Sequence, residues 1–233
     1  MNDGIVKKIY RVKDIKYIQD KINMLGNNRK FKFSAVTFLN MRIITTILLG
    51  IVLILFTNIK YFLIPFMLII YYNLFYYFLI THEINKRVKK LDKEALTFFE
   101  ILTLTLESGK NLENSLEITC YNIDSELSME FKKSLNELEY GKSLMEALSD
   151  LRKRIPSENI NNIILNILET NVFGNSIIDV MNNQVDYLRD KQIMEVKSEI
   201  NKIPNKVSII SVLFIIPLIL LIVLGPFIIS FLG

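Results

Sequence analysis

The sequence predicts an all-α membrane protein with about three transmembrane helices and a cytoplasmic bundle of about six helices. Three stretches, 43–59, 61–82 and 207–233, contain no Asp, Glu, Lys or Arg, and each is close to the length of apolar chain that crosses a bilayer. Over 84–203 apolar side chains recur every three or four residues, which is the period of a helix that buries one face. No part of the sequence alternates with a period of two for long enough to predict a strand.

The N-terminal segment, residues 1–42, is basic, with ten Lys and Arg against three Asp. Apolar residues recur at helical spacing over 1–25, and Gly26 can end such a helix. We interpret this stretch as an amphipathic helix that rests on anionic membrane lipid. An arm that binds nucleic acid is the alternative. However, Lys and Arg collect on the cytoplasmic side of membrane spans in any case, so we expect no nucleic acid as a partner.

The distribution of charge also predicts the topology and the division into domains. The basic segment places the N-terminus in the cytoplasm. Residues 43–82 are expected to form a transmembrane hairpin that turns near 57–60, because Lys and Arg reappear directly after it. Residues 83–206 then form a cytoplasmic helical-bundle domain. Residues 207–233 form a C-terminal transmembrane helix that carries the C-terminus out of a multi-pass protein of the cell membrane.

Three glycines punctuate the bundle at nearly equal spacing: Gly109, Gly141 and Gly174. Each is expected to end a helix in the left-handed conformation, and an Asn or Ser two positions later can cap the next helix. Ser143 and Glu146 have the spacing of a capping box. A period near 33 residues is also typical of tetratricopeptide and ankyrin arrays. The repeated unit here is only the turn, so we interpret the glycines as the turns of three helical hairpins.

The sequence favours a protein without catalytic or cofactor chemistry. Gly141-Lys142-Ser143 is similar to the end of a phosphate-binding loop, but that loop needs a Gly five positions earlier and a strand before it. An Asn on an amphipathic helix stands there instead. His82 and Cys120 are the only His and Cys, which argues against zinc. The predicted spans contain no ionisable residue except His82 at an edge, which argues against a membrane enzyme or transporter.

Two further residue sets are candidates for contacts and motion. Acidic residues cluster around the predicted turns, either as solvated helix ends or as a surface for a basic partner: Glu107, Glu113, Glu137, Glu139 and Glu146. Three prolines follow the bundle, and we consider them a coupling hinge: Pro204, Pro217 and Pro226. Pro204 is expected to bend or interrupt a helix over 176–203, about 42 Å long, where it meets the third span.

Several short stretches together resemble one family. In order, they are 106–109 (LESG), 137–141 (ELEYG), 146–148 (EAL), 174–177 (GNSI), 188–191 (LRDK), 202–206 (KIPNK), 214–217 (FIIP) and 225–226 (GP). Their order and spacing resemble the membrane module of type II secretion system protein F, the inner-membrane platform family. Type II secretion and type IVa pilus platform proteins carry this module twice. A single copy is more similar to the platform proteins of Tad pili, of the TadC type rather than the TadB type.

The resemblance implies a role without enzymatic activity or a cofactor. It implies an inner-membrane platform of a type IV or Tad-like pilus, or of a type II secretion-like machine. Such a platform couples a cytoplasmic hexameric secretion ATPase to pilin assembly. The implied partners are that ATPase, pilin subunits, a paralogous TadB-type platform protein and membrane lipid, in a homo- or hetero-oligomer. The alternative is a membrane-anchored helical scaffold or signalling protein that docks another cytoplasmic partner.

Overall fold

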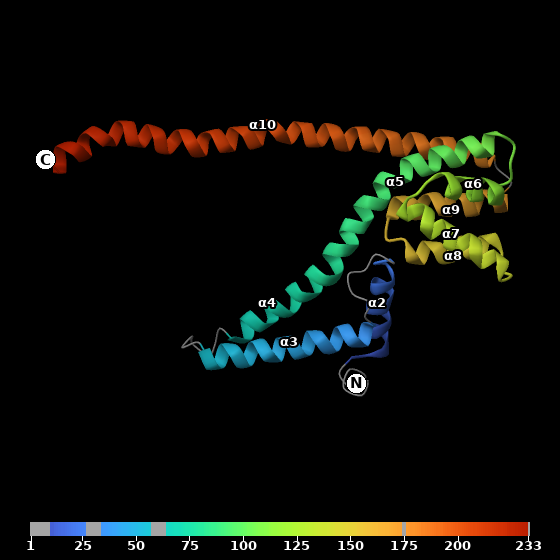
Figure 1. Cartoon of the computed structure of the whole chain (residues 1–233), viewed down its shortest axis with the longest axis horizontal. Coiled ribbons are helices and arrows are strands. Elements are labelled where there is room, and N and C mark those ends of the chain that lie inside the picture. The colour runs from blue at the N-terminus through green and yellow to red at the C-terminus, as the bar shows by residue number, and fades with distance from the viewer. Residues whose placement is uncertain (1–9, 27–33, 57–63, 174–175, 233) are drawn as a thin grey trace. The chain divides into compact units, whose positions relative to one another are not determined.

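The structure is a computed structural model that describes residues 10–26, 34–56, 64–173 and 176–232 (Figure 1). All regular secondary structure in these ranges is helical. The chain forms two compact units, Met1–Asn183 and Gln184–Gly233. Six α-helices, α5 to α10, follow the second apolar stretch. The predicted fold class, three membrane-spanning helices with a helical bundle, is confirmed.

Three helical stretches of the described residues are long and apolar enough to cross a membrane: Ala35–Leu55, Ile64–Glu107 and Ile177–Leu224. The first begins at Ala35 rather than at residue 43, so it includes Arg42. The helix therefore begins eight residues before the predicted span and carries Arg42 just ahead of the charge-free stretch. Sequence analysis placed the boundary at the last charge, whereas the helix starts further back, where its first turns are covered by protein.

The N-terminal helix α2, Val12–Asn23, packs across the first turns of α3, Ala35–Phe56 (Figure 1). Ile18 and Ile22 of α2 are buried in one apolar cluster with residues of α3, the second span and α5. This corrects the expectation that these two side chains rest on lipid. Gly26 ends the segment with a φ of +71°. The first residues of the predicted amphipathic helix lie outside the described residues.

The second span continues into the bundle as one helical rod. It comprises α4, Ile64–Tyr76, the π-helical turn η2, Tyr77–Thr81, and α5, His82–Glu107. A π turn holds an extra residue, so it shifts the phase of the helix that follows. Ile80 of η2 and Ile84 of α5 face the same core as α2. No sign of η2 is visible in the sequence, because the stretch 61–82 carries no Asp, Glu, Lys or Arg whose spacing would reveal a change of helical phase. The predicted turn near 57–60 lies outside the described residues.

Four shorter helices complete the bundle around α5: α6, Leu112–Asn122, α7, Glu126–Glu139, α8, Leu144–Arg154, and α9, Glu158–Phe173. Consecutive helices pack against each other from α5 to α9, and α5 also contacts α7 and α9. Figure 1 shows these helices lying side by side. Each helix buries the face that the sequence periodicity predicts, and α5 supplies the longest buried stripe.

The centre of the bundle is aromatic. Phe98 of α5 and Phe131 of α7 stack with their ring centroids 4.6 Å apart, and Phe99 meets the same ring edge-on at 6.2 Å. All three side chains are fully buried. Offset and edge-to-face pairs of this kind add about 0.5–1.5 kcal/mol each beyond their area burial. α5 is therefore held at the centre of the bundle by its largest apolar residues.

Two of the predicted glycine turns lie in open space. Gly109 and Gly141 have φ of +83° and +87°, the left-handed conformation expected where each ends a helix. A methyl group added at either would meet nothing within 4 Å. Their conformation is thus required by the turn and not by a neighbour. Gly174 lies outside the described residues.

The residues after the turns cap the next helices. Asn111 accepts a hydrogen bond from the backbone in the first turn of α6. Ser143 and Glu146 form the predicted capping box at the start of α8. Ser176 accepts from the backbone N–H of Asp179, over 3.4 Å, at the start of α10. These bonds satisfy backbone donors that the helices leave unpaired.

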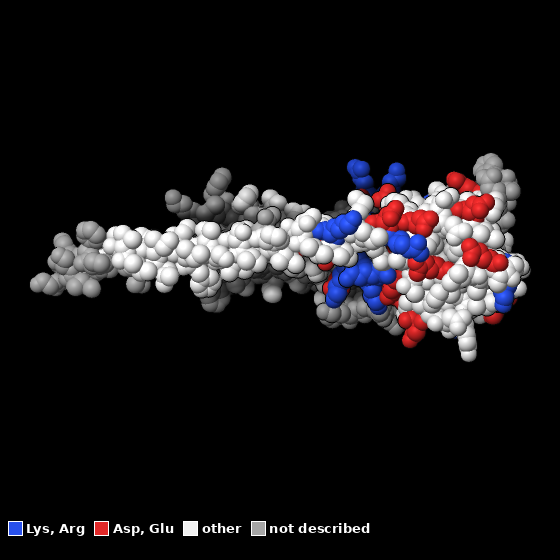
Figure 2. Space-filling view, turned by 90° about the horizontal axis from the view of Figure 1, so that it is seen from above, with Lys and Arg blue, Asp and Glu red and all other residues white. Residues whose placement is uncertain are grey.

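The last helix, α10, is one α-helix over Ile177–Leu232 that passes through Pro204, Pro217 and Pro226 without a break. Of the two outcomes expected at Pro204, a bend or an interruption, the interruption is therefore wrong. A proline removes only one hydrogen bond of the helix. The other backbone groups of an apolar helix in lipid have no water to bind, so they keep their helical hydrogen bonds and the helix continues. In Figure 2 the apolar length of α10 carries no charged side chain.

Candidate functional site

A buried arginine on α5 joins four segments of the chain. Arg87 is 6% exposed, and all three nitrogens of its guanidinium donate hydrogen bonds. Nε donates to Glu126 Oε1 over 2.6 Å, and Nη2 to Glu130 Oε1 over 3.0 Å. Nη1 donates to the carbonyl oxygens of Met24, over 2.6 Å, and Arg154, over 3.0 Å. We call these five residues the Arg87 junction. It joins α5, α7, the end of α8 and the end of the N-terminal segment.

Two lysines at the edge of the junction also pair with its carboxylates. Lys90 Nζ lies 3.1 Å from Glu126 Oε2, and Lys133 Nζ lies 2.9 Å from Glu130 Oε1. Burial by itself would raise the pKa of Glu126, but the hydrogen bonds and charges of Arg87 and Lys90 outweigh it and lower that pKa. Removing one partner of a buried ion pair typically costs about 3–5 kcal/mol, because the remaining charge stays buried. The junction is therefore sensitive to the loss of any member.

Gly26 covers the guanidinium of Arg87. A methyl group on Gly26 would lie 2.6 Å from Cζ and 2.7 Å from Nε of Arg87. Its φ of +71° already disfavours any side chain. Sequence analysis identified Gly26 only as a helix stop. The structure adds a second reason for glycine, which is that the backbone must approach a buried charge.

Two carboxylates further along α5 hold the beginnings of other helices. Glu94 Oε2 accepts from the backbone N–H of Leu127, over 3.0 Å, in the first turn of α7. Asp92 accepts from Ser157 and, over 2.9 Å, from Asn159 Nδ2 at the start of α9. Carboxylates near helix N-termini satisfy free backbone donors and interact favourably with the helix dipole. α5 therefore fixes α7 and α9 at defined positions along the rod.

Sequence analysis did not single out Arg87, Glu126 or Glu130 as site residues. A signal was present: Arg87 lies three residues after Ile84 and four before Leu91, on the flank of the predicted apolar stripe. Likewise Glu126 and Glu130 lie four residues apart beside the apolar positions of α7. Charged residues at helical spacing from buried apolar residues lie on the same face of the helix. They are therefore partly buried, and charged groups are rarely buried unless they are paired.

The five acidic residues proposed as a partner surface lie at the helix ends around two turns. Glu137 pairs with Lys142 Nζ over 2.6 Å and with Arg154 Nη1 over 2.9 Å, and the hydrogen bond from Lys142 is the main reason why its pKa is lowered. Glu146 belongs to the capping box. Glu107 accepts from Asn182 Nδ2 over 3.2 Å. These three carboxylates therefore stabilise the bundle itself.

The other two acids, Glu113 and Glu139, are exposed at the α5–α6 and α7–α8 turns. Tyr140, beside Glu139, is 87% exposed. Because consecutive helices run in opposite directions, these two turns lie at the same end of the bundle (Figure 1). That end thus presents free acidic groups together with an aromatic side chain.

The Gly141-Lys142-Ser143 stretch is a helix-to-helix turn between α7 and α8, as predicted, and not a phosphate-binding loop. Lys142 Nζ is bound by Glu137 and, over 3.1 Å, by Asp150. Lys153 and Lys142 lower the pKa of Asp150 to about 2. With its ammonium group neutralised by two carboxylates, Lys142 has a structural role in the turn.

Cys120 is buried in the bundle, as its position on an apolar stripe predicts. Burial raises the pKa of its thiol to about 11. Since the thiolate is the reactive form, this group should react with thiol reagents only when the bundle opens. Among the described residues, no group of His, Cys, Asp and Glu is arranged to hold a metal ion.

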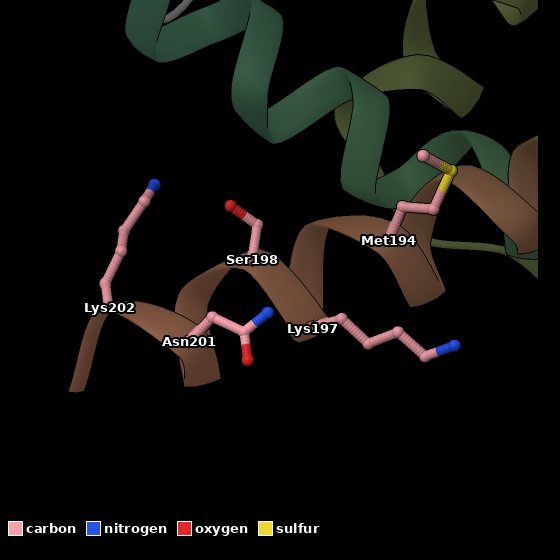
Figure 3. A pocket seen from close by; sticks show the side chains of 5 residues that line it. All are labelled: Met194, Lys197, Ser198, Asn201 and Lys202. Carbon is pink, nitrogen blue, oxygen red and sulfur yellow. The ribbon is translucent and has the colours of Figure 1, made fainter. Parts of the chain in front are cut away.

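An open groove lies on α10 just before its apolar length, lined by Met194, Lys197, Ser198, Asn201 and Lys202 (Figure 3). All five side chains come from successive turns of the same helix. The groove is open, and its lining includes no carboxylate, histidine or cysteine.

Residues 98–225, more than half of the chain, match the family described as type II secretion system (T2SS), protein F. The chain belongs to this protein F family. Comparison with curated proteins and with solved structures found no match. Protein F family members are membrane platform proteins of secretion and pilus systems, with a structural and not an enzymatic role. This protein F is accordingly a multi-pass inner-membrane protein.

The family match begins in the middle of α5, so the Arg87 junction crosses its boundary. Arg87, Met24 and Gly26 precede the matched residues, whereas Glu126, Glu130 and Arg154 lie within them. In this protein F the shared module is thus fixed to the second span and to the N-terminal segment by residues outside the matched part.

Proposed function

We propose that this protein F is a single-module platform of a Tad-type pilus machine, of the TadC type, which couples a hexameric secretion ATPase to pilin assembly. Its bundle faces the cytoplasm, its N-terminus lies inside and its C-terminus outside, as the distribution of Lys and Arg favours. Its partners are the ATPase, pilin subunits and a TadB-type paralogue in a common oligomer.

The observation that supports this proposal best is the fixed connection between the bundle and the second span. α5 continues the span without a loop, and Arg87, Asp92 and Glu94 tie it to α7, α8 and α9. A force applied to any of these helices therefore reaches the membrane through buried ionic contacts and a rigid rod. A scaffold that only displays a docking site has no need of such a connection.

Within this proposal the two long helices have different roles. The Arg87 junction anchors the bundle on the second span through α5. α10 carries displacement from the bundle into the third span, because it is a single helix from Ile177 to Leu232. Pro204, Pro217 and Pro226 are points where that helix can bend without breaking, since each removes a backbone hydrogen bond.

We assign the ATPase contact to the end of the bundle that carries Glu113, Glu139 and Tyr140. These side chains are exposed. The neighbouring carboxylate of Glu137, by contrast, is paired with Lys142 and Arg154. Exposed acids and an aromatic group fit a basic partner surface with an apolar patch.

Site-specific photo-crosslinking in cells tests the contact. A photo-reactive residue at Glu139 should crosslink to the secretion ATPase. The matched control carries the photo-reactive residue at Tyr121. Tyr121 is 89% exposed, but it lies at the C-terminal end of α6, which is the other end of the bundle. Crosslinking to an unrelated cytoplasmic protein at Glu139, with none to the ATPase, would favour the scaffold or signalling alternative.

Reporter fusions test the orientation independently. A reporter within residues 110–115 and one after Gly233 should report opposite compartments, the first cytoplasmic and the second external. Two cytoplasmic reports would contradict the three-span topology on which the platform proposal depends.

A further inference from the structure

A second buried arginine lies inside the first candidate span. Arg42 of α3 is 8% exposed and lies within Ala35–Leu55. Its Nε and Nη2 donate to the carbonyl oxygen of Tyr72 over 3.1 and 2.9 Å. The guanidinium also lies 3.4 Å from the centre of the Tyr72 ring and 5.5 Å from that of Tyr76. An ionisable residue in a span marks a functional site by default, because burying it is costly.

Arg42 differs from Arg87 in having no carboxylate. No ion pair is formed by Arg42 with any acid in the part of the chain that the structure describes. Its nitrogen Nη1 donates to no acceptor among the described residues. The charge is thus held by a carbonyl and two aromatic faces. A desolvated cation of this kind calls for an anion.

Hydroxyl groups and the basic helix α2 accompany Arg42. Tyr10, just before α2, shares a hydrogen bond with the hydroxyl of Tyr72, so two hydroxyl groups accompany the guanidinium. Lys13 and Lys16 of α2 are exposed on the same N-terminal helix. Arg42 lies about 10 Å along α3 from its first residue, and a long helical side chain points back towards the N-terminal end.

The length of α3 that follows is apolar and exposed, with Ile44, Ile47 and Leu48 each more than half exposed. An acyl chain can lie along these residues while its headgroup reaches the guanidinium. A phosphate group matches the planar fork of arginine, and tyrosine hydroxyls can donate to its remaining oxygens. We propose that Arg42, with the hydroxyls of Tyr10 and Tyr72, binds the phosphate group of a membrane phospholipid.

Lipid binding by the purified full chain tests this site. Native mass spectrometry would measure retention of phosphatidylglycerol, and thermal unfolding would measure stabilisation by the same lipid. Arg42→Gln should weaken retention at least about tenfold, since a hydrogen-bonded charge is removed. Tyr10→Phe should weaken it less, because it removes one hydroxyl and keeps the ring. Lys110→Gln, which changes an exposed charge between α5 and α6, is the control and should bind as the wild type does.

Two further ligands separate the contribution of the phosphate group from that of the acyl chains. Diacylglycerol, which has the acyl chains without the phosphate, should not stabilise the wild type, and inorganic phosphate without lipid should not either. Protection of the Cys120 thiol shows that each variant is folded before its binding is compared. Equal retention of phosphatidylglycerol by wild type and Arg42→Gln would overturn the proposal. Full stabilisation by inorganic phosphate alone would overturn the assignment to lipid.

Discussion

A methyl group added to Gly26 would lie 2.6 Å from Cζ of Arg87, so the end of the N-terminal segment fits directly onto a buried charge. The same guanidinium donates to the carbonyl oxygen of Met24, two residues before Gly26, and to the carboxylates of Glu126 and Glu130 on α7. The junction therefore holds together segments that lie on both sides of the transmembrane hairpin in the sequence. Its stability should depend on Gly26 as well as on the ion pairs.

Gly26→Ala should destabilise the protein more than Gly141→Ala does. Both positions have φ between +70° and +90°, so each Ala costs about 1–2 kcal/mol of backbone strain. Only Gly26 adds a collision with Arg87, because a methyl group on Gly141 meets nothing within 4 Å. Thermal unfolding of the detergent-solubilised chain, followed by Cys120 reactivity, measures the difference. Equal effects of the two substitutions would show that the guanidinium can move away freely.

Arg87→Met should cost about 3–5 kcal/mol of unfolding free energy, because it leaves Glu126 and Glu130 buried without their shared partner. Adding Glu126→Gln and Glu130→Gln to the same chain should recover part of that loss, since neutral amides avoid the burial of unpaired charge. A double-mutant cycle on unfolding free energies measures this coupling. Strictly additive losses would contradict an interaction between Arg87 and the two glutamates.

Stability should fall in acid through Glu126. The pKa of its carboxyl is lowered from its usual 4.5, because Arg87 and Lys90 favour the ionised form against the opposing effect of burial. A lowered pKa in the folded state contributes stability that is complete above 4.5 and is lost as the pH falls through the lowered value. Unfolding measured from neutral pH down to about pH 3 tests this. Glu126→Gln should reduce the fall in unfolding free energy between neutral pH and about pH 3. If the fall is the same as in the wild type, other carboxylates cause it.

The features that the sequence predicts well are those with a local signal. Apolar length predicts the spans, and a glycine followed by a capping residue predicts the turns at Gly109 and Gly141, because the left-handed conformation and the cap are properties of a few adjacent residues. The junction depends instead on partners far apart in the sequence. Arg87 meets Glu126 and Glu130 only after α5, α6 and α7 have packed.

The membrane boundary illustrates the same limit. Sequence analysis ended the basic segment at Arg42, because a charged residue usually marks the edge of a span. The structure places Arg42 inside α3, where Tyr72 supplies a carbonyl and an aromatic face. Nothing local in the sequence around either residue indicates that pairing. The π turn η2, which determines the direction in which Ile80 and Ile84 face, likewise has no local signal in the sequence.

The most direct test of force transmission is a short flexible Gly/Ser insertion after Ile203 in α10. Such a linker behaves as a random coil, so it uncouples the third span from the bundle while each part keeps its own apolar pattern. The same insertion after Asp124, in the connection between α6 and α7 at the end of the bundle away from the proposed ATPase contact, is the control and should leave pilus assembly intact. We expect normal abundance and retained ATPase binding with the insertion after Ile203, but no assembled pili. Assembly at the wild-type level with that insertion would contradict transmission along α10.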